Sequence, residues 1–216
     1  MTNAAGQTSA GGEMRTSATQ ALSPGFSDPV FDSQKCFRVV LDALAHPGRP
    51  YPLDVGVRPP SPLNQTSAAL VLTLADFETP VWLDPNLAGC TGVSDWIRFH
   101  TGARIVEDSY AARFAVISDA KALPSLSGFS CGSQEYPDES ATLIIQVDAL
   151  QDGAGPTLTG PGIETENRLQ PAPLSAPFWF QAIDNAALYP RGIDFIFATA
   201  DALAALPRST QIELEA

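Results

Sequence analysis

Three short segments that consist mostly of apolar residues constrain the fold of this chain more than any other feature. They cover residues 114–117, 142–147 and 193–198, and polar or glycine-rich stretches flank each of them. Strands that are buried on both faces of a parallel or mixed sheet have this composition, whereas strands with one solvated face alternate between apolar and polar residues. The sequence therefore predicts a buried central sheet.

Helical patterns alternate with these strands. Asp32 is expected to cap a helix over 33–45, in which Phe37, Val40, Leu41 and Leu44 form an apolar stripe. Further helices are expected over 66–76, 93–100, 177–188 and 201–206, further strands over 51–55, 81–83, 157–159 and 211–214, and a loop over 124–140. The alternation predicts an α/β fold, a mixed sheet covered by helices.

The first 25 residues differ in composition from the rest. They are rich in Ser, Thr, Ala, Gly and Gln and contain almost no large apolar side chain. Such a segment cannot bury enough apolar surface to offset its ordering entropy. We therefore expect a disordered tail over 1–25 and a single α/β domain over 26–216.

The charge balance excludes several classes of partner. The chain has 12 Lys and Arg against 24 Asp and Glu, a net charge of −12, and its basic residues are scattered singly. Binding to nucleic acid or to an acidic membrane surface needs clustered basic residues. The sequence predicts neither partner, and no apolar run approaches the roughly 20 residues of a membrane span.

Cysteine and histidine are too sparse for a metal site. Cys36, Cys90 and Cys131 are odd in number and form no Cys-x-x-Cys motif, and His46 and His100 lack the spacing of a preformed metal site. We expect no metal, and a reduced, cytoplasmic compartment.

The run Leu158-Thr-Gly-Pro-Gly-Ile163 can form a turn in which backbone N–H groups face an anion. Two later segments, 189–194 and 206–210, also set Pro-Arg beside an apolar run. Arginine suits bidentate recognition of phosphate or carboxylate. The candidate ligand-binding residues are Arg38, Arg98, His100, Thr159, Gly160, Gly162, Arg191, Asp194 and Arg208. The alternative is that the turns are ordinary and the arginines pair with acidic residues.

No catalytic residue is indicated. Gly128-Phe-Ser-Cys-Gly132 matches a hydrolase nucleophile motif, but a loop precedes Ser130 and both histidines lie upstream of it. Lys35 and Lys121 stand in contexts unlike that of a lysine bound to pyridoxal phosphate. Dinucleotide and Walker A motifs are absent, so we expect no cofactor.

Six short motifs occur in an order that resembles one family. They are Gln34-Lys-Cys-Phe-Arg38 with His46-Pro-Gly48; Leu72-Thr-Leu-Ala-Asp76 with Thr79-Pro-Val-Trp82; Arg98-Phe-His-Thr101; Leu158 to Ile163; Tyr189-Pro-Arg-Gly-Ile-Asp194; and Pro207-Arg-Ser-Thr210. In order and spacing they resemble PhnH, a subunit of the bacterial carbon–phosphorus lyase system. Tyr189 and Ser209 are mild departures, where Phe and Thr are expected.

The resemblance implies a fold similar to the large domain of pyridoxal-phosphate-dependent transferases, without the cofactor. It also implies a homodimer that joins the other core subunits of the lyase. That complex supports transfer of the ribose triphosphate moiety of ATP to a phosphonate, with release of adenine. Within it the subunit is expected to be accessory or to bind a phosphorylated small molecule, and to have no independent activity. The alternative is a stand-alone small-molecule α/β enzyme, for which the chain lacks a nucleophile–base pair.

Overall fold

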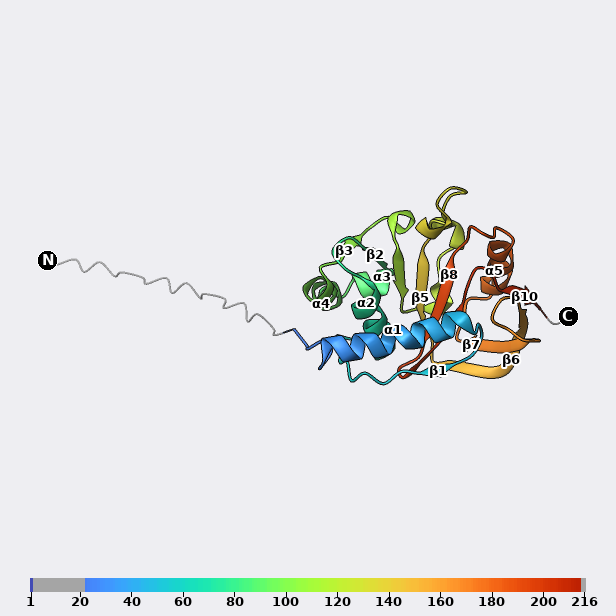
Figure 1. Cartoon of the computed structure of the whole chain (residues 1–216). Helices are drawn as coiled ribbons and strands as arrows, with labels where there is room; N and C mark the ends of the chain where they lie inside the picture. The colour runs from blue at the N-terminus through green and yellow to red at the C-terminus, as the bar shows by residue number, and fades with distance from the viewer. Residues whose placement is uncertain (2–21, 215–216) are drawn as a thin grey trace.

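The structure is a computed structural model that describes Met1 and residues 22–214. Most of the expected disordered tail, residues 2–21, lies outside the described part. A seven-stranded sheet forms the centre of the domain, in the order β1-β9-β8-β5-β4-β2-β3 (Figure 1). Its strands are β1 (Tyr51–Pro52), β2 (Pro80–Leu83), β3 (Arg104–Val106), β4 (Phe114–Ile117), β5 (Thr142–Gln146), β8 (Asp194–Ala198) and β9 (Ala202–Leu206).

The sheet is mixed, as predicted. Strands β3, β2, β4, β5 and β8 are parallel, and β9 runs antiparallel to both of its neighbours, β8 and β1. The three apolar runs are central strands, because only a strand covered on both faces can bury every side chain. The fold class, α/β with a mixed sheet and helices, is therefore confirmed.

Residues 201–206 were expected to form a short helix, and this prediction is wrong. They form β9, in which Leu206 pairs with Phe195 and Leu203 pairs with both Ala198 and Tyr51. In a short run of apolar residues, the spacing of apolar and polar side chains cannot distinguish a helix from a strand. Here pairing with two neighbouring strands outweighs the helix propensity of the alanines. The expected strand over 51–55 shortens to β1.

A second sheet of three antiparallel strands packs beside the first, in the order β10-β6-β7. Its strands are β6 (Ala149–Thr159), β7 (Asn167–Ala172) and β10 (Gln211–Glu213). The sequence indicated only the last three residues of β6 and did not indicate β7. Residues 211–213 do form an edge strand, but of this small sheet.

Five α-helices connect the strands in the described part: α1 (Pro29–Ala45), α2 (Gln65–Leu74), α3 (Pro85–Ala88), α4 (Thr91–Thr101) and α5 (Phe178–Ala186). Helix α1 begins four residues before the expected start, because Asp28 and not Asp32 is its N-cap. The Asp28 carboxylate accepts from the Phe31 N–H, and the Asp32 carboxylate accepts from the Asp28 N–H at 3.0 Å. This reciprocal pair acts as a capping box does, with the returning carboxylate at the fourth helical residue and not at the third. None of the helices in residues 22–214 is long and apolar enough to cross a membrane.

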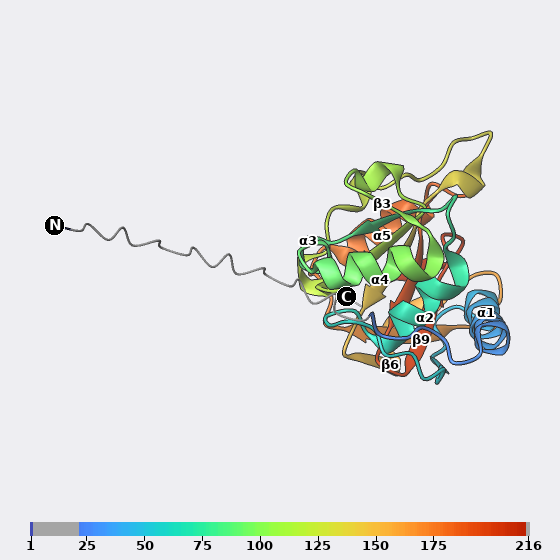
Figure 2. The same ribbon diagram turned by 90° about the vertical axis from the view of Figure 1, so that its left-hand side faces the viewer.

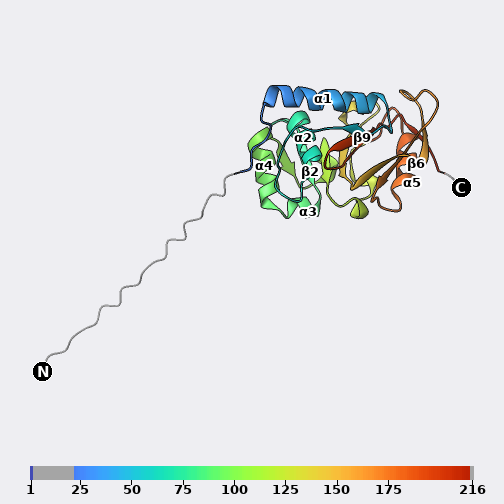
Figure 3. The ribbon, with the colours of Figure 1, turned by 90° about the horizontal axis from the view of Figure 1, so that it is seen from below.

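Helices α1, α2 and α4 cover one face of the main sheet, while α5 and the small sheet cover the other (Figures 2 and 3). On β5, Ile144 faces the first layer and Leu143 and Ile145 face the second, in keeping with the two-residue period of a strand. The two apolar layers form the core of the domain.

Helix α1 does not bury the whole stripe expected for it. Val40 is buried with Cys36 and Ala43, but Phe37 and Leu41 point outward. Val30 and Phe31 are also exposed, at 73% and 70%. Helix α1 therefore has apolar side chains on its inner face and on its outer face.

Candidate functional site

The turn at residues 160–163 is packed tightly against backbone on two sides. A Cβ atom added at Gly162, where φ is +83°, would lie 2.0 Å from the carbonyl oxygen of Ala45 at the end of α1. A Cβ added at Gly160, where φ is +127°, would lie 3.0 Å from the carbonyl oxygen of Ser209. Glycine is needed at both positions because of the backbone conformation and the close approach.

Hydrogen bonds around this turn link the segment after α1 to β7 and to β9. The Asn167 side chain donates to the carbonyl of Pro47 at 2.7 Å, and the Gly48 N–H donates to the carbonyl of Ala205 at 3.0 Å. Thr159 pairs with Gln211 in the small sheet. The turn is a junction between the end of α1, the small sheet and the segment after β9.

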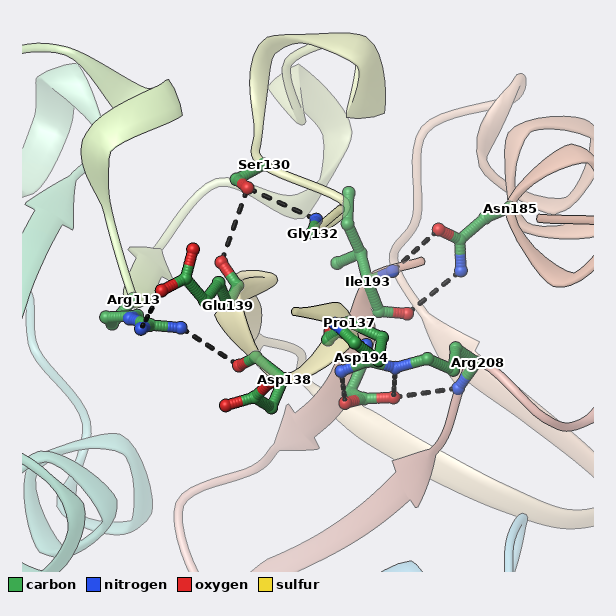
Figure 4. Close-up of polar contacts among 10 residues, drawn as sticks. All are labelled: Arg113, Ser130, Gly132, Pro137, Asp138, Glu139, Asn185, Ile193, Asp194 and Arg208. Atoms are coloured by element: carbon green, nitrogen blue, oxygen red, sulfur yellow. Dashed lines mark hydrogen bonds and ion pairs between the residues drawn. The ribbon is translucent and has the colours of Figure 1, made fainter. Parts of the chain in front are cut away.

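Arg208 is held in this junction by Asp194. The Asp194 carboxylate accepts from the Arg208 N–H at 2.8 Å and from Nε at 3.0 Å, and it also contacts Nη2 (Figure 4). The side chains are only 15% and 20% exposed. Arg208 Nη1 donates to the carbonyl of Pro137 at 2.6 Å. The guanidinium is thus bonded to protein groups, as the ion-pair reading of the arginines predicted.

Arg113 forms a second link to the same loop, and no sequence pattern indicated it. Its Nη1 donates to the carbonyl of Asp138 at 2.9 Å, and Nη2 lies 3.8 Å from the Glu139 carboxylate (Figure 4). Arg113 and Arg208 therefore bond to neighbouring carbonyls of one 3₁₀ turn, Pro137–Glu139. The link is between residues distant in sequence, so a local pattern cannot reveal it.

Arg191 and Gly192 lie in the turn before β8. The Arg191 Nε is buried without a hydrogen-bond partner among the described residues. A Cβ added at Gly192, where φ is +128°, would lie 3.1 Å from both the carbonyl oxygen of Asn185 and the Arg208 Cβ. The Asn185 side chain in turn bonds both the N–H and the carbonyl of Ile193. This turn is fixed against α5 and Arg208.

The remaining candidates lie on other elements. Arg98, on α4, is paired with Asp95 at 3.7 Å, with both side chains more than half exposed. His100 Nε2 contacts the carbonyl of Ser23 at 3.1 Å, and Trp96 Nε1 donates to the same oxygen at 2.7 Å. His100 therefore helps to anchor the segment before α1. Arg38 lies on the solvent-exposed outer face of α1.

Six of the nine candidates thus lie in or beside the junction, and three lie on other elements. Gly160 and Gly162 share the junction with Thr159, Asp194 and Arg208. Arg191 lies at the edge of this group, because the next residue, Gly192, packs against Arg208. The α4 pair and Arg38 belong to other surfaces. Whether any of the nine binds a ligand stays a prediction.

Ser130 lies in a loop between two 3₁₀ turns and not between a strand and a helix. Its hydroxyl donates to the carbonyl of Glu139 and accepts from the Gly132 N–H. This context differs from a nucleophile elbow, as the sequence predicted.

Sequence reasoning missed one buried carboxylate. Asp84 follows β2 and is 4% exposed. It accepts hydrogen bonds from the N–H groups of Leu87 at 2.8 Å and Ser118 at 2.7 Å, and from that of Asp119 at 3.1 Å. It therefore joins the carboxyl ends of the parallel strands β2 and β4. The only available signal was an Asp between an apolar residue and Pro, and it indicates no more than a helix cap.

Comparisons with known proteins give the family. Residues 24–213 match the model of the family described as "Bacterial phosphonate metabolism protein (PhnH)". The chain is 40% identical over 200 residues to the "Alpha-D-ribose 1-methylphosphonate 5-triphosphate synthase subunit PhnH" of Rhizobium meliloti (strain 1021), covering 93% of this chain and 100% of that protein. It is 31% identical over 182 residues to the "Putative C-P lyase subunit protein HtxG" of Stutzerimonas stutzeri, covering 84% of this chain and 86% of that protein. The resemblance drawn from the ordered motifs is confirmed, and this chain belongs to the PhnH family of bacterial phosphonate metabolism proteins.

Proposed function

We propose that this chain is a subunit of a carbon–phosphorus lyase core complex that takes part in phosphonate catabolism in the cytoplasm. In this complex it supports transfer of the ribose triphosphate moiety of ATP to a phosphonate, with release of adenine. The observation that carries the proposal is the match to a named synthase subunit over that subunit's whole length. The role of the chain itself is accessory.

The finer fold assignment belongs to the same proposal. We assign the domain to a cofactor-free relative of the large domain of pyridoxal-phosphate-dependent transferases. A seven-stranded sheet in which one strand, β9, is reversed supports this assignment. Lys35 donates to the carbonyl of Asp54 at 2.6 Å and so has a structural contact.

The outer face of α1 supports a homodimer. Val30, Phe37 and Leu41 recur at helical spacing on this face, with Phe31 and Arg38 beside them. A helix of 17 residues paired with its own copy about a two-fold axis would cover all of these side chains. The two copies would run antiparallel, so that Leu41 of one faces Val30 of the other.

Binding of a phosphorylated ligand is a further role within the proposal. Arg98 and Arg191 support it better than Arg208, whose donors already bond to protein acceptors, and better than Arg38, which lies on the face assigned to the dimer. Calorimetry with ATP and with methylphosphonate tests it. Heat of binding that disappears in an Arg191→Met variant supports the role, and no heat with either ligand rejects it.

Co-expression tests the main proposal. A tagged form of this chain is expressed with the other core subunits of its lyase system and captured by the tag. We expect stoichiometric capture of those subunits and ATP-dependent release of adenine from the captured complex with methylphosphonate. A stand-alone enzyme would instead be captured alone and would turn over its substrate alone.

A further inference from the structure

A cavity of about 480 Å³ opens beside α5, on the face of the main sheet opposite α1. Its floor is apolar and consists of Leu126, Phe129 and Ile193, each at most 6% exposed. Tyr110 and Leu188 line its mouth and are exposed to solvent. Its volume is within the range of preformed binding pockets, roughly 300–1,000 Å³.

Hydrogen bonds fix the walls of this cavity. The Gln181 side-chain oxygen accepts from the Leu126 N–H at 2.8 Å, which joins α5 to the loop after β4. Asn185 bonds both backbone groups of Ile193, at 2.7 and 2.9 Å. The Gly192 N–H donates to the carbonyl of Cys131 at 2.9 Å. The cavity is therefore preorganised and needs no rearrangement to accept an occupant.

The charge of the lining selects against phosphate. Asp184 is the one charged residue among the eleven that line the cavity. An anion placed there would have no cation to replace its water and would meet a carboxylate. The lining is instead complementary to a ligand that places an apolar group in the cavity and a basic group next to the Asp184 carboxylate.

Exposed apolar side chains continue outward from the mouth. Phe180, Asp184 and Leu188 recur every four residues and so form one stripe along α5 and the turn after it. Phe180 is 64% exposed and Tyr110 60%. Large exposed aromatic groups around a pocket, with one charge at the rim, are typical of a protein–protein interface.

We propose that this cavity receives an apolar side chain, flanked by Lys or Arg, from another protein subunit of the carbon–phosphorus lyase complex. The inference rests on the proposed function and adds to it the surface and the chemistry of the contact. The apolar side chain fills the floor over Phe129 and Ile193, and the basic group pairs with Asp184. Interface anchors of this kind, buried in a pocket with a polar rim, supply most of the binding energy of an interface.

Cys131 provides a direct probe, because it lines the cavity as a free thiol. Cys90 is free and partly exposed outside the cavity lining, so it serves as the internal reference. Alkylation by iodoacetamide is followed by mass spectrometry in the isolated chain and in the captured complex. We expect Cys131 labelling to slow about tenfold or more in the complex while Cys90 is unchanged, as mass action predicts for an occupied site. Equal labelling of Cys131 in both samples would overturn the proposal.

Two variants test the same contact by capture. Leu188→Glu places a charge at the mouth, and Ser127→Trp fills the cavity from its wall. We expect each to reduce capture of the core subunits by about 30-fold or more, the scale of an interface anchor. Phe99→Glu, at a 70% exposed position on α4, is the matched control and should leave capture unchanged. Circular dichroism of each variant verifies the fold.

The outcomes separate the two proposals. Capture of the subunits by wild type and by both variants alike, with Cys131 unprotected, overturns the cavity assignment and leaves the proposed function intact. Failure of wild type to capture any subunit overturns both. Protection of Cys131 by small apolar compounds, but not by the core subunits, would identify a small-molecule site and overturn the assignment to a partner protein.

Discussion

Gly162 lies against the carbonyl oxygen of Ala45, so close that a side chain at position 162 would place its first carbon 2.0 Å from that oxygen. Gly162→Ala must move the end of α1 away from the turn and must also hold alanine at φ +83°. We expect a loss of about 3 kcal/mol or more in the free energy of unfolding, measured with urea, since strain and displaced packing add.

Gly153→Ala is the control: φ is +74° there, but no atom lies within 4 Å of the added carbon. It should cost about 1–2 kcal/mol, the cost of the backbone conformation alone. Equal losses in the two variants would show that the contact with Ala45 is unimportant.

Removal of one partner of the Arg208–Asp194 pair should lower the free energy of unfolding substantially. Asp194→Ala leaves a mostly buried guanidinium without its carboxylate, and it also removes the acceptor for the Arg208 N–H. We expect a loss of about 3–5 kcal/mol in the free energy of unfolding. The exposed pair of Arg98 and Asp95 offers the matched control, and Asp95→Ala should cost less than about 1 kcal/mol. The proposal of a buried structural pair fails if the two losses are alike.

Asp84 should be more important for folding than a helix cap normally is. Asp84→Ala leaves three backbone N–H groups without their acceptor, that of Leu87 in α3 and those of Ser118 and Asp119 after β4. Unpaired buried donors cost about 1–3 kcal/mol each, less where water reaches them, so we expect a loss of about 3 kcal/mol or more. Asp119→Ala, which removes an exposed cap of a 3₁₀ turn, should cost about 1 kcal/mol. Thermal unfolding of both variants gives the comparison.

Burial raises the pKa of the Cys36 thiol from 9.0 to about 11. Because the folded pKa is above the unfolded one, the unfolded chain loses this proton first as the pH rises. The thiol therefore stabilises the folded state below pH 9, and that stabilisation is lost between pH 9 and about 11. The difference in unfolding free energy between wild type and Cys36→Ala should shrink across this range by about 2 kcal/mol. A difference that is independent of pH would contradict the raised pKa.

The homodimer predicted for the outer face of α1 can be tested at the same level of detail. Phe31→Ser with Leu41→Ser removes two exposed apolar side chains and leaves the buried Cys36 and Val40 in place. Sedimentation velocity should show a dimer for wild type and a monomer for the double variant, with unchanged thermal stability of the monomer fold. Phe77→Ser, at another exposed aromatic residue, should remain a dimer. A wild-type chain that sediments as a monomer at high concentration would reject the interface.

The central strands β4, β5 and β8 could be predicted from sequence, because each is a run of apolar residues that only a doubly covered strand can accommodate. Residues 202–206 are equally apolar, but the sequence shows no alternation that would distinguish a strand from a helix. Their structure is decided by pairing with β8 at Phe195 and with β1 at Tyr51. The candidate site shows the same division. Gly160 and Gly162 are recognisable in the sequence as residues of a turn, whereas the carbonyl groups that make glycine necessary come from residues 45 and 209. Arg113 has no local signal at all, because both its partners follow about 25 residues later.

Strand β9 lies between β8 and β1, and so it joins the first strand of the chain to the main sheet. During synthesis, residues 51–52 leave the ribosome about 150 residues before the strand that pairs with them. The same late segment carries Arg208 and then β10, which joins the small sheet to β6. The strand that pairs with β1 is therefore available only when translation is nearly complete. Loss of the residues from 207 onward would leave β9 intact but remove Arg208 and β10, so a truncated product would lack both the partner of Asp194 and the third strand of the small sheet.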